Sequence, residues 1–271
     1  MEKPENWSKY ITWWNQYFDT KINLAVRRLY DDVSTLVKYQ FEHSDEYKEL
    51  IHQLHNYGAE YRRSYGYDLL MKEPEDIKLI PKEWERFISK VWRKNVVQNI
   101  NWNTEKWDKE KCQPNRGWIT PDNWFEKIHD IVRTRIVVKY FDGVELLLDK
   151  MHHHFEDFGC QCAPDWEARE EGYYAAHLNV THDYELPVGL ETQKKRICVE
   201  IQITTQMKDV ITSLTHKYYE RKRESLEPPD KKWQWDYESD EFSPNYIGHI
   251  LHYIEGTVMQ IRDREQANGK R

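Results

Sequence analysis

The stretch Arg196–Gln202, RICVEIQ, decides how the rest of the chain is interpreted, and it continues as ITTQMKDVITSLTHKYYERKR. Its alternating β-branched residues predict a buried strand that runs into an amphipathic helix. The pleat of a strand sends successive side chains to opposite faces. One face, expected in the core, carries Val199, Ile201 and Ile203, and the other, expected to be open, carries Cys198, Glu200 and Gln202. A carboxylate in mid-strand is costly to bury unless cations or hydrogen bonds satisfy it. Glu200 is therefore a candidate functional residue, the alternative being a polar strand face that simply meets water.

Length and composition narrow the class of protein. A chain of 271 residues fits one large domain, or a core domain with helical additions. Charged residues make up 32%, but 12 Trp, 18 Tyr and 8 Phe supply core material, which favours a soluble folded protein over disorder. No apolar run approaches the ~20 residues that span a bilayer, and the first residues lack a signal-peptide core. We therefore expect a cytoplasmic protein with reduced cysteines and no membrane partner.

The net charge of −7 argues against a nucleic-acid binder that uses its whole surface, although a local basic patch remains possible. The pair Arg62-Arg63, with tyrosines nearby, is such a patch. Its alternative is a solvated helix face. The histidines 152–154 occupy successive helical positions about 100° apart, so they cannot all reach one metal. Cys160-Gln-Cys162 has too few Cys or His neighbours in the sequence to indicate a zinc site.

The first 75 residues are expected to form a helical region packed on a core domain of residues 76–271. A helical stripe comprises Ile22, Val26, Leu29, Val33 and Leu36. A second helix is expected over about 46–63, broken near Gly58 and ended by the SYGYD segment, and a third over 81–98. The tryptophans of the first 18 residues are expected either to cap the core or to form a surface for self-association. Residues 99–123 lack periodicity and are expected to be a loop.

From residue 128 the pattern becomes mixed, with strands near 131–140, 172–181 and 196–203. Asp142 opens a helix with a capping-box-like acid pair, and its predicted stripe is Val144, Leu147, Leu148, Met151 and Phe155. A loop is expected over 158–171. The helix after the Glu200 strand is expected to bury Met207, Val210, Ile211, Leu214 and Tyr218. A linker reaches Asp240, and Ser243-Pro244 starts a last helix to about Arg264.

Polar residues converge from three of these strands. Asp130 lies at the entry of the first, Tyr173 and His177 share a face of the second, and Glu200 and Gln202 share a face of the third. Two carboxylates from neighbouring strands suit a site for Mg²⁺ and a nucleotide, because Mg²⁺ prefers hard oxygen ligands together with phosphates and water. The basic side chains expected to face polyphosphate, or alternatively to form salt bridges at the rim of the sheet, are Arg133, Arg135 and Lys139.

Three segments together resemble the synthetase domain of the RelA/SpoT family, the (p)ppGpp alarmone synthetases. They are HDIVRTRIVVKYFDGVELL, EGYYAAHLNV and VEIQITTQMKDVITSLTHKYYERKR. A fainter fourth match, Lys82–Lys94, resembles the basic ATP-pocket helix of that family. The resemblance covers roughly residues 80–265 and is specific because several motifs occur in order. It implies an α+β fold, with a nucleotidyltransferase-like mixed sheet flanked by helices and with helical additions at both ends of the chain.

The resemblance also implies a reaction, the transfer of pyrophosphate from ATP to a ribose 3′-hydroxyl with Mg²⁺ as cofactor. Asp130 and Glu200 would be the catalytic and metal-binding carboxylates. The residues implied to bind ATP are Lys82, Lys90, Lys94 and Arg135. Those implied to bind the acceptor, GTP or GDP, are Tyr173, His177, Gln202 and Lys139. His129-Asp130 lacks the further ligands of an HD hydrolase, so synthesis without hydrolysis is expected.

Several positions depart from the family pattern. Where arginines are expected, the chain has Ile80, Tyr174 and Thr204, and Arg133 replaces a small residue. Fewer cations near the acceptor leave three hypotheses open. The first is an alarmone synthetase that uses a guanosine nucleotide. The second is a toxin or defence enzyme that modifies the 3′ end of tRNA or an adenosine nucleotide. The third is a catalytically degenerate module that binds nucleotides. A homo-oligomer is possible in each case.

Overall fold

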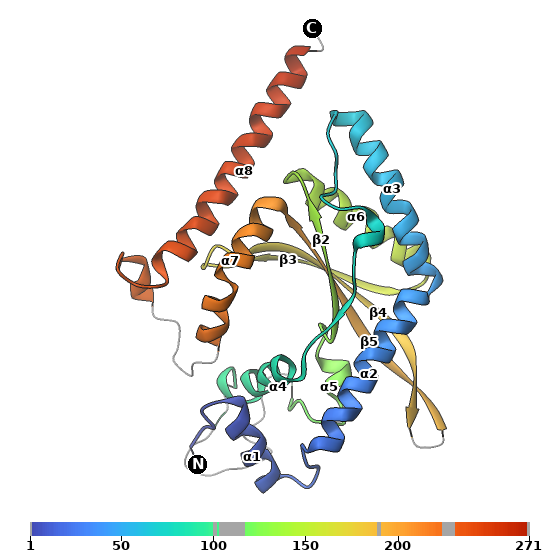
Figure 1. Ribbon diagram of the computed structural model, residues 1–271, viewed down its shortest axis with the longest axis vertical. Helices are drawn as coiled ribbons and strands as arrows, with labels where there is room; N and C mark the ends of the chain where they lie inside the picture. Colours follow the sequence, from blue (N-terminus) through green and yellow to red (C-terminus); the bar gives the residue numbers. More distant parts are fainter. Residues whose placement is uncertain (1, 100–101, 103–116, 189–190, 224–230, 270–271) are drawn as a thin grey trace.

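The chain forms one five-stranded mixed sheet with helices packed around it (Figure 1). This computed structural model describes residues 2–99, 102, 117–188, 191–223 and 231–269. The strands, in the spatial order β1-β2-β5-β4-β3, are β1 (Ile80–Pro81), β2 (Val132–Val138), β5 (Glu191–Thr205), β4 (Tyr174–Val188) and β3 (Gln161–Ala168). The predicted α+β class is confirmed, and the three predicted strands are neighbours in one sheet.

The register of the sheet explains which residues share a face. Strand β2 pairs with β5 in parallel, and β5 pairs with β4 antiparallel. Gln202 on β5 lies opposite Arg135 on one side and His177 on the other. Because directly opposed residues point to the same face of a sheet, the polar side chains of all three strands gather on one face. The other face is apolar and lies in the core.

The alternation predicted for β5 is correct in direction, but its polar face is not open. Val199, Ile201 and Ile203 are each 0% exposed, as expected of a core face. Glu200 and Gln202 are each only 8% exposed. The expectation of a polar face open to water was therefore wrong. Glu200 is a buried carboxylate, which requires compensating partners.

Eight α-helices are described, and shorter helical turns join them. They are α1 (Trp7–Tyr17), α2 (Leu24–His43), α3 (Asp45–Tyr65), α4 (Trp84–Trp92), α5 (Trp124–Lys127), α6 (Asp142–Asp157), α7 (Gln206–Arg223) and α8 (Phe242–Gly269). Two 3₁₀ turns cover Pro74–Asp76 and Lys231–Gln234, and a π-helical turn covers Arg93–Val97. Within the described ranges, every helix is either too short or too polar to cross a bilayer.

The N-terminal helices share one hydrophobic core with the sheet. Trp14 in α1 is 1% exposed, and its ring stacks on Phe18 with centroids 3.9 Å apart. The early tryptophans therefore cap the core, which was one of the two predicted alternatives. In α2 the inward face differs from the predicted stripe, because Ile22 precedes the helix and Leu29 is 49% exposed. The helix instead buries Tyr30, Val33, Ser34, Val37 and Phe41.

Helix α3 runs without a break through Gly58, contrary to expectation, and ends where predicted. Gly66 has a φ of 81° and its N–H donates to the Arg62 carbonyl oxygen at 2.8 Å. This left-handed conformation suits glycine, which has no Cβ. The predicted helix over 81–98 divides into β1, α4 and the π-helical turn. Most of the predicted loop 99–123 falls outside the described residues.

Two further corrections concern the mixed region. The segment 158–171, predicted as a loop, contains the edge strand β3. The predicted stripe of α6 is confirmed, since all five of its residues are buried. Its predicted capping box is not, because Phe141 is the N-cap residue and no side-chain hydrogen bond caps the described helix start. The last helix begins at Phe242, close to the predicted start at Ser243, and continues to Gly269.

Helix α7 does not bury the face predicted for it. Met207, Val210 and Leu214 are 38%, 54% and 74% exposed, and Ile211 is half-buried. The side chain of Tyr218 lies outside the described residues. Helix α8 packs beside α7 along the outside of the molecule (Figure 1). It also exposes apolar residues, such as Ile250 and Tyr253. The amphipathic pattern was real, but part of its apolar side faces solvent.

Candidate active site

A buried ion cluster forms around Asp130, directly before β2. Lys82, which follows β1, makes an ion pair with Asp130 Oδ2, and the Lys90 ammonium of α4 lies 2.8 Å from Oδ1. The Lys82 N–H donates to the Ile131 carbonyl oxygen at 2.7 Å, which fixes the start of α4 beside the sheet. The side chains of Lys82 and Asp130 are only 8% and 9% exposed. Three predicted site residues from distant segments therefore meet.

Opposing effects set the pKa values in this cluster. Burial lowers the pKa of Lys82 to about 8, although the attraction of Asp130 acts in the opposite direction. The charges of Lys90 and Arg133 lower it further. For Asp130, burial alone would raise the pKa, but the ammonium groups of Lys82 and Lys90 hold it below its usual range. The carboxylate is thus ionised at neutral pH, and Lys82 is close to titration.

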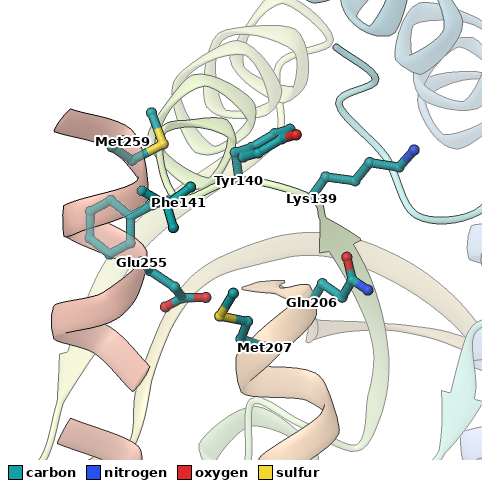
Figure 2. A pocket seen from close by; sticks show the side chains of 8 residues that line it. Lys139, Tyr140, Phe141, Gln206, Met207, Glu255 and Met259 are labelled. Carbon is teal, nitrogen blue, oxygen red and sulfur yellow. The ribbon is translucent and has the colours of Figure 1, made fainter. Parts of the chain in front are cut away.

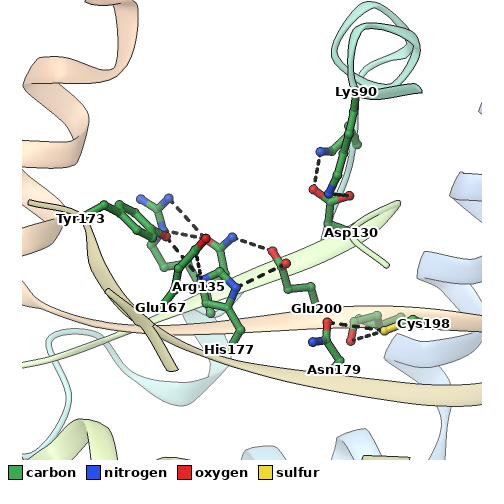
Figure 3. A network of polar contacts seen from close by, with 12 residues as sticks. Lys90, Asp130, Arg135, Glu167, Tyr173, His177, Asn179, Cys198 and Glu200 are labelled. Atoms are coloured by element: carbon green, nitrogen blue, oxygen red, sulfur yellow. Dashed lines mark hydrogen bonds and ion pairs between the residues drawn. The ribbon is translucent and has the colours of Figure 1, made fainter. Parts of the chain in front are cut away.

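Glu200 is held by two neighbours on the polar face of the sheet (Figure 3). The Gln202 side-chain amide donates to Glu200 Oε1 at 2.6 Å, and His177 Nδ1 lies 3.5 Å from Oε2. Burial acts to raise the pKa of Glu200, but the bonds from His177 and Gln202 outweigh it, so the pKa is lowered. Burial acts to lower the pKa of His177, but Glu200 and Glu167 raise it overall. Each partner therefore favours the charged form of the other.

Tyr173 lies at the outer end of the same network. Its hydroxyl is 3.4 Å from His177 Nε2, and Glu167 Oε2 is 3.6 Å from that nitrogen. The Arg169 guanidinium lies over the Tyr173 ring at 5.3 Å and also bonds Glu167. The sequence analysis did not find Glu167 and Arg169. Both belong to or follow β3, which was predicted as a loop, so no period-2 pattern pointed to them.

Arg135 joins this second group of residues rather than the Asp130 cluster. Its guanidinium donates to Gln202 Oε1 at 3.4 Å and to Asp209 of α7 at 2.9 Å. Asp209 is a further residue that the sequence analysis missed. Arg135 therefore links the start of α7 to the polar face of the sheet. Its neighbours Tyr173, His177 and Gln202 are those implied to bind the acceptor.

The two carboxylates implied to be catalytic act on each other. The charge of Asp130 raises the pKa of Glu200, in opposition to the hydrogen bonds described above. Figure 3 shows both side chains above the same stretch of sheet. Both carboxylates have lowered pKa values and so supply ionised hard oxygen donors, and the two lysines show that Asp130 attracts cations. The donor chemistry therefore fits Mg²⁺, which takes one or two carboxylates together with substrate phosphates.

The two remaining predicted residues are Lys139, which lies apart from these clusters, and Lys94. Lys139 follows the end of β2, and its ammonium is bonded to Asp68 at 2.8 Å. It lines a separate cavity of about 180 Å³ with Met207, Glu255 and other residues (Figure 2). The structure does not bring it to Tyr173, His177 and Gln202. Lys94 lies in the π-helical turn, four residues beyond Lys90, and is half-buried.

The position of Tyr174 explains one departure in the sequence. The Tyr174 ring stacks on His252 of α8 with centroids 3.8 Å apart, and its hydroxyl lies 2.9 Å from His249 Nδ1. The Lys208 ammonium lies 4.5 Å from the centre of the same ring and donates to the Gly248 carbonyl oxygen. A tyrosine here attaches α8 to the sheet, so this position supplies no cation to the site. Ile80, a second departure, is 59% exposed on β1.

Comparison with known proteins points to the same family as the sequence motifs. Residues 81–224 match a family model described as "Region found in RelA / SpoT proteins". GTP pyrophosphokinase YwaC of Bacillus subtilis (strain 168) is 31% identical over 103 residues, which are 37% of this chain and 47% of that protein. The match thus spans about half the length of this curated relative.

Solved structures show the same fold at low identity. A GTP pyrophosphokinase family protein from Streptococcus pneumoniae superposes with a TM-score of 0.52 at 16% identity, covering 91% of this chain and 97% of that one. Small alarmone synthetase 1 from Bacillus subtilis gives 0.52 at 17%, covering 88% and 98%. These likenesses support the fold alone. Because the family model covers more than half of the sequence, the chain belongs to the RelA/SpoT family.

Proposed function

We propose that the protein is a Mg²⁺-dependent pyrophosphokinase that transfers the β,γ-pyrophosphate of ATP to the ribose 3′-hydroxyl of GTP or GDP. The observation that carries this proposal is the placement of two buried carboxylates, Asp130 and Glu200, beside a lysine cluster. The relative YwaC is named a GTP pyrophosphokinase. A structure of small alarmone synthetase 1 from Bacillus subtilis, with a TM-score of 0.50 at 16% identity, is described as bound to its product pppGpp.

The ATP side of the site would be the Asp130 cluster. Lys82 and Lys90 point at Asp130 and are partly or fully buried, so their charge acts in a medium that screens it weakly. Such preorganised cations stabilise the charge that spreads over phosphoryl oxygens during transfer. Lys94 would extend this cationic surface along the same segment. Asp130 and Glu200 would hold Mg²⁺, which supplies further charge neutralisation on the phosphates when bound.

The acceptor side would be the Glu200 network. The 3′-oxygen attacks the β-phosphorus, the bond from that phosphorus to the α,β-bridging oxygen breaks, and AMP leaves. The proton of the 3′-hydroxyl passes to Glu200, which is ionised because its pKa is lowered. His177 and Gln202 hold that carboxylate in place. The Tyr173 ring offers a flat surface for the acceptor base.

A direct assay tests this function and its alternatives together. The purified protein is incubated with Mg²⁺ and ATP labelled in the γ-phosphate, and separately with GTP, GDP, unlabelled ATP and deacylated tRNA. We expect label to move to GTP or GDP, with AMP formed in equal amount. Transfer only to tRNA or to ATP would support the toxin-like alternative. Transfer to none of them would support the degenerate nucleotide-binding module and overturn the proposal.

A tRNA acceptor is the second candidate, and one surface favours it. Arg62 and Arg63 lie in the last turn of α3, and the Arg62 side chain is 69% exposed although it pairs with Asp68. A polynucleotide recovers affinity through phosphate contacts of this kind, with strong salt dependence. Reversing both charges to glutamate should abolish transfer to tRNA and leave transfer to a mononucleotide intact. Lys48→Glu, at the other end of the same helix, is the matched control.

Three further properties complete the proposal. We expect no hydrolysis of the product, which incubation of the protein with ppGpp and divalent metal would check. We also expect the protein to work in the cytoplasm, where ATP and GTP are available. Self-association is supported by the apolar side chains that α7 and α8 expose.

A further inference from the structure

Three potential metal ligands meet on the apolar face of the sheet, away from Glu200. They are Glu46 in the first turn of α3, Cys160 between α6 and β3, and His182 on β4, and their ligand atoms all lie within 4.8 Å of one another. The register explains the meeting of Cys160 and His182. Gln161 pairs with Thr181, so Cys160 and His182 are the next opposed positions in the antiparallel ladder. His182 lies two residues beyond Val180, whose partner is the core residue Val199.

The carboxylate of Glu46 lacks the partners that burial demands. Glu46 is 7% exposed, and its Oε1 is buried with no hydrogen-bond partner among the described residues. The His182 Nδ1 atom lies 3.6 Å from this oxygen, which is beyond hydrogen-bond distance. The backbone is fixed at this point, since His154 Nε2 bonds the Glu46 carbonyl oxygen at 2.8 Å. A buried carboxylate oxygen without a hydrogen-bond partner is costly, and a bound cation would satisfy it.

A second unpartnered atom lies in the same place. The Tyr184 side chain is 0% exposed, and within the described chain its hydroxyl also has no hydrogen-bond partner. Its ring contacts His182 edge-on, with centroids 5.4 Å apart. Burial, followed by the charges of Glu46 and nearby cysteines, raises the pKa of Tyr184 well above its usual value, so the hydroxyl stays neutral. The cluster therefore combines buried, unpartnered oxygens of Glu46 and Tyr184 with the half-buried Cys160 and the exposed His182, so an ion could enter it from solvent.

We propose that Glu46, Cys160 and His182 bind a divalent transition-metal ion, and that the ion they fit best is Zn²⁺. A mixed set of sulfur, nitrogen and oxygen donors is typical of zinc, whose d¹⁰ shell imposes no geometry of its own. Metal–ligand distances of about 2.0–2.3 Å in a tetrahedron place neighbouring ligand atoms about 3.3–3.7 Å apart. The 3.6 Å between Glu46 Oε1 and His182 Nδ1 matches such an edge. Water would take the fourth position.

The ion would act as a clamp between parts of the fold. Glu46 belongs to the N-terminal helices, whereas Cys160 and His182 belong to the β3–β4 end of the sheet. A bound ion would join these segments on the face opposite the polar network of Glu200. It would therefore stabilise the fold rather than take part in pyrophosphate transfer. Binding would also displace the thiol proton of Cys160, whose pKa is raised to about 11 by burial and by Glu46.

The test uses the full chain, stripped of metal with a chelator and then titrated with Co²⁺ and Zn²⁺. We expect one equivalent of Co²⁺ to give a thiolate-to-cobalt charge-transfer band, and Zn²⁺ to abolish it. Cys160→Ser should remove the band. Glu46→Gln or His182→Gln should weaken Zn²⁺ binding by at least ~100-fold, because loss of a direct ligand should cost no less than loss of a residue that only hydrogen-bonds a ligand. Cys162→Ser and His153→Gln, from the same region, are matched controls that should bind as the unchanged protein does.

Two measurements on the unchanged protein guard against variants that fail to fold. Zn²⁺ should raise the melting temperature in a concentration-dependent way, because it binds the folded state. It should also slow alkylation of Cys160 by iodoacetamide at least ~10-fold, as read by mass spectrometry, and leave Cys162 unprotected. Absence of the cobalt band in the unchanged protein, or equal protection of both cysteines, would overturn the proposal.

Discussion

At the scale of single residues, the site keeps two buried carboxylates ionised by different means. The negative charge of Asp130 is balanced by ion pairs with the ammonium groups of Lys82 and Lys90. Glu200 is stabilised by an imidazole and an amide at distances of 3.5 and 2.6 Å, which are mainly hydrogen-bonding groups. When a nucleotide binds, the ammonium groups of these two lysines can form ion pairs with its phosphate oxygens in place of Asp130. The partners of Glu200 instead fix its direction, as a proton acceptor requires.

Replacing Glu200 by glutamine should abolish most activity and leave the fold intact. The amide keeps the shape of the side chain but neither carries the charge nor accepts a proton. We expect pyrophosphate transfer to fall by at least ~10²-fold, the scale of a lost general base. Steady-state kinetics measure the loss, and the melting temperature checks the fold. Glu185→Gln, at an exposed position of β4, is the control. Full activity of Glu200→Gln would contradict the proposed mechanism.

The alkaline limb of the pH profile should report Lys82. Its pKa is about 8, so the ammonium is charged below that pH and loses its proton as pH rises through it. Because kcat/KM reflects the free enzyme, we expect kcat/KM for ATP to fall above about pH 8. Lys82→Arg keeps the charge at high pH and should move this limb upward. An unchanged limb in the arginine variant would assign it to another group.

At the scale of elements, alternation and helical periodicity predicted the three central strands and α6 correctly. They failed at β3, because Pro164 and the acidic residues Asp165 and Glu167 resemble a loop. An edge strand tolerates proline, since one side of its backbone is unpaired. The helical periodicity correctly indicated that α7 is amphipathic, but it could not show whether another part of the fold covers the apolar side of the helix. The contacts of Glu167, Arg169 and Asp209 depend on these placements, which explains why the sequence did not reveal them.

The backbone of helix α8 at Gly248 lies so close to the turn at Gly172, directly before Tyr173, that there is no room for a side chain. A Cβ at Gly248 would lie 2.5 Å from the Gly172 carbonyl oxygen, whereas a Cβ at Gly256 meets nothing within 4 Å. Gly248→Ala should therefore push α8 from the turn, and Gly256→Ala on the same helix is the matched control. We expect the two variants to differ in unfolding free energy by about 1–3 kcal/mol, the usual cost of overpacking.

The same pair of variants tests the link between α8 and the acceptor site. Displacement of Gly172 moves the neighbouring Tyr173, so Gly248→Ala should raise KM for the acceptor more than KM for ATP. Denaturant unfolding and two-substrate kinetics measure both effects. Equal stability and equal KM values in the two alanine variants would show that α8 does not position this turn.

At the scale of the whole molecule, the two faces of the sheet have separate roles. One gathers the polar residues of β2, β4 and β5 and supports the proposed chemistry. The other joins the N-terminal helices into one core and carries the proposed zinc clamp. Helices α7 and α8 lie on the outside of the molecule and expose apolar side chains to solvent. Ile250 and Tyr253 are 54% and 76% exposed, and they occupy neighbouring positions on one side of α8.

Self-association through α7 and α8 is expected to cover these residues. Leu214 of α7, together with Ile250 and Tyr253 of α8, exposes large apolar surface, and fully burying a Leu or Ile side chain contributes about 1.5–3 kcal/mol. Light scattering after size exclusion should therefore give a mass that is a multiple of 33.2 kDa. Ile250→Glu should weaken the assembly at least ~10-fold, since the charge would be desolvated at the interface. Leu29→Glu, on α2 at the other side of the molecule (Figure 1), should leave the mass unchanged. A monomer at all protein concentrations would contradict this prediction and assign these exposed residues to a different partner.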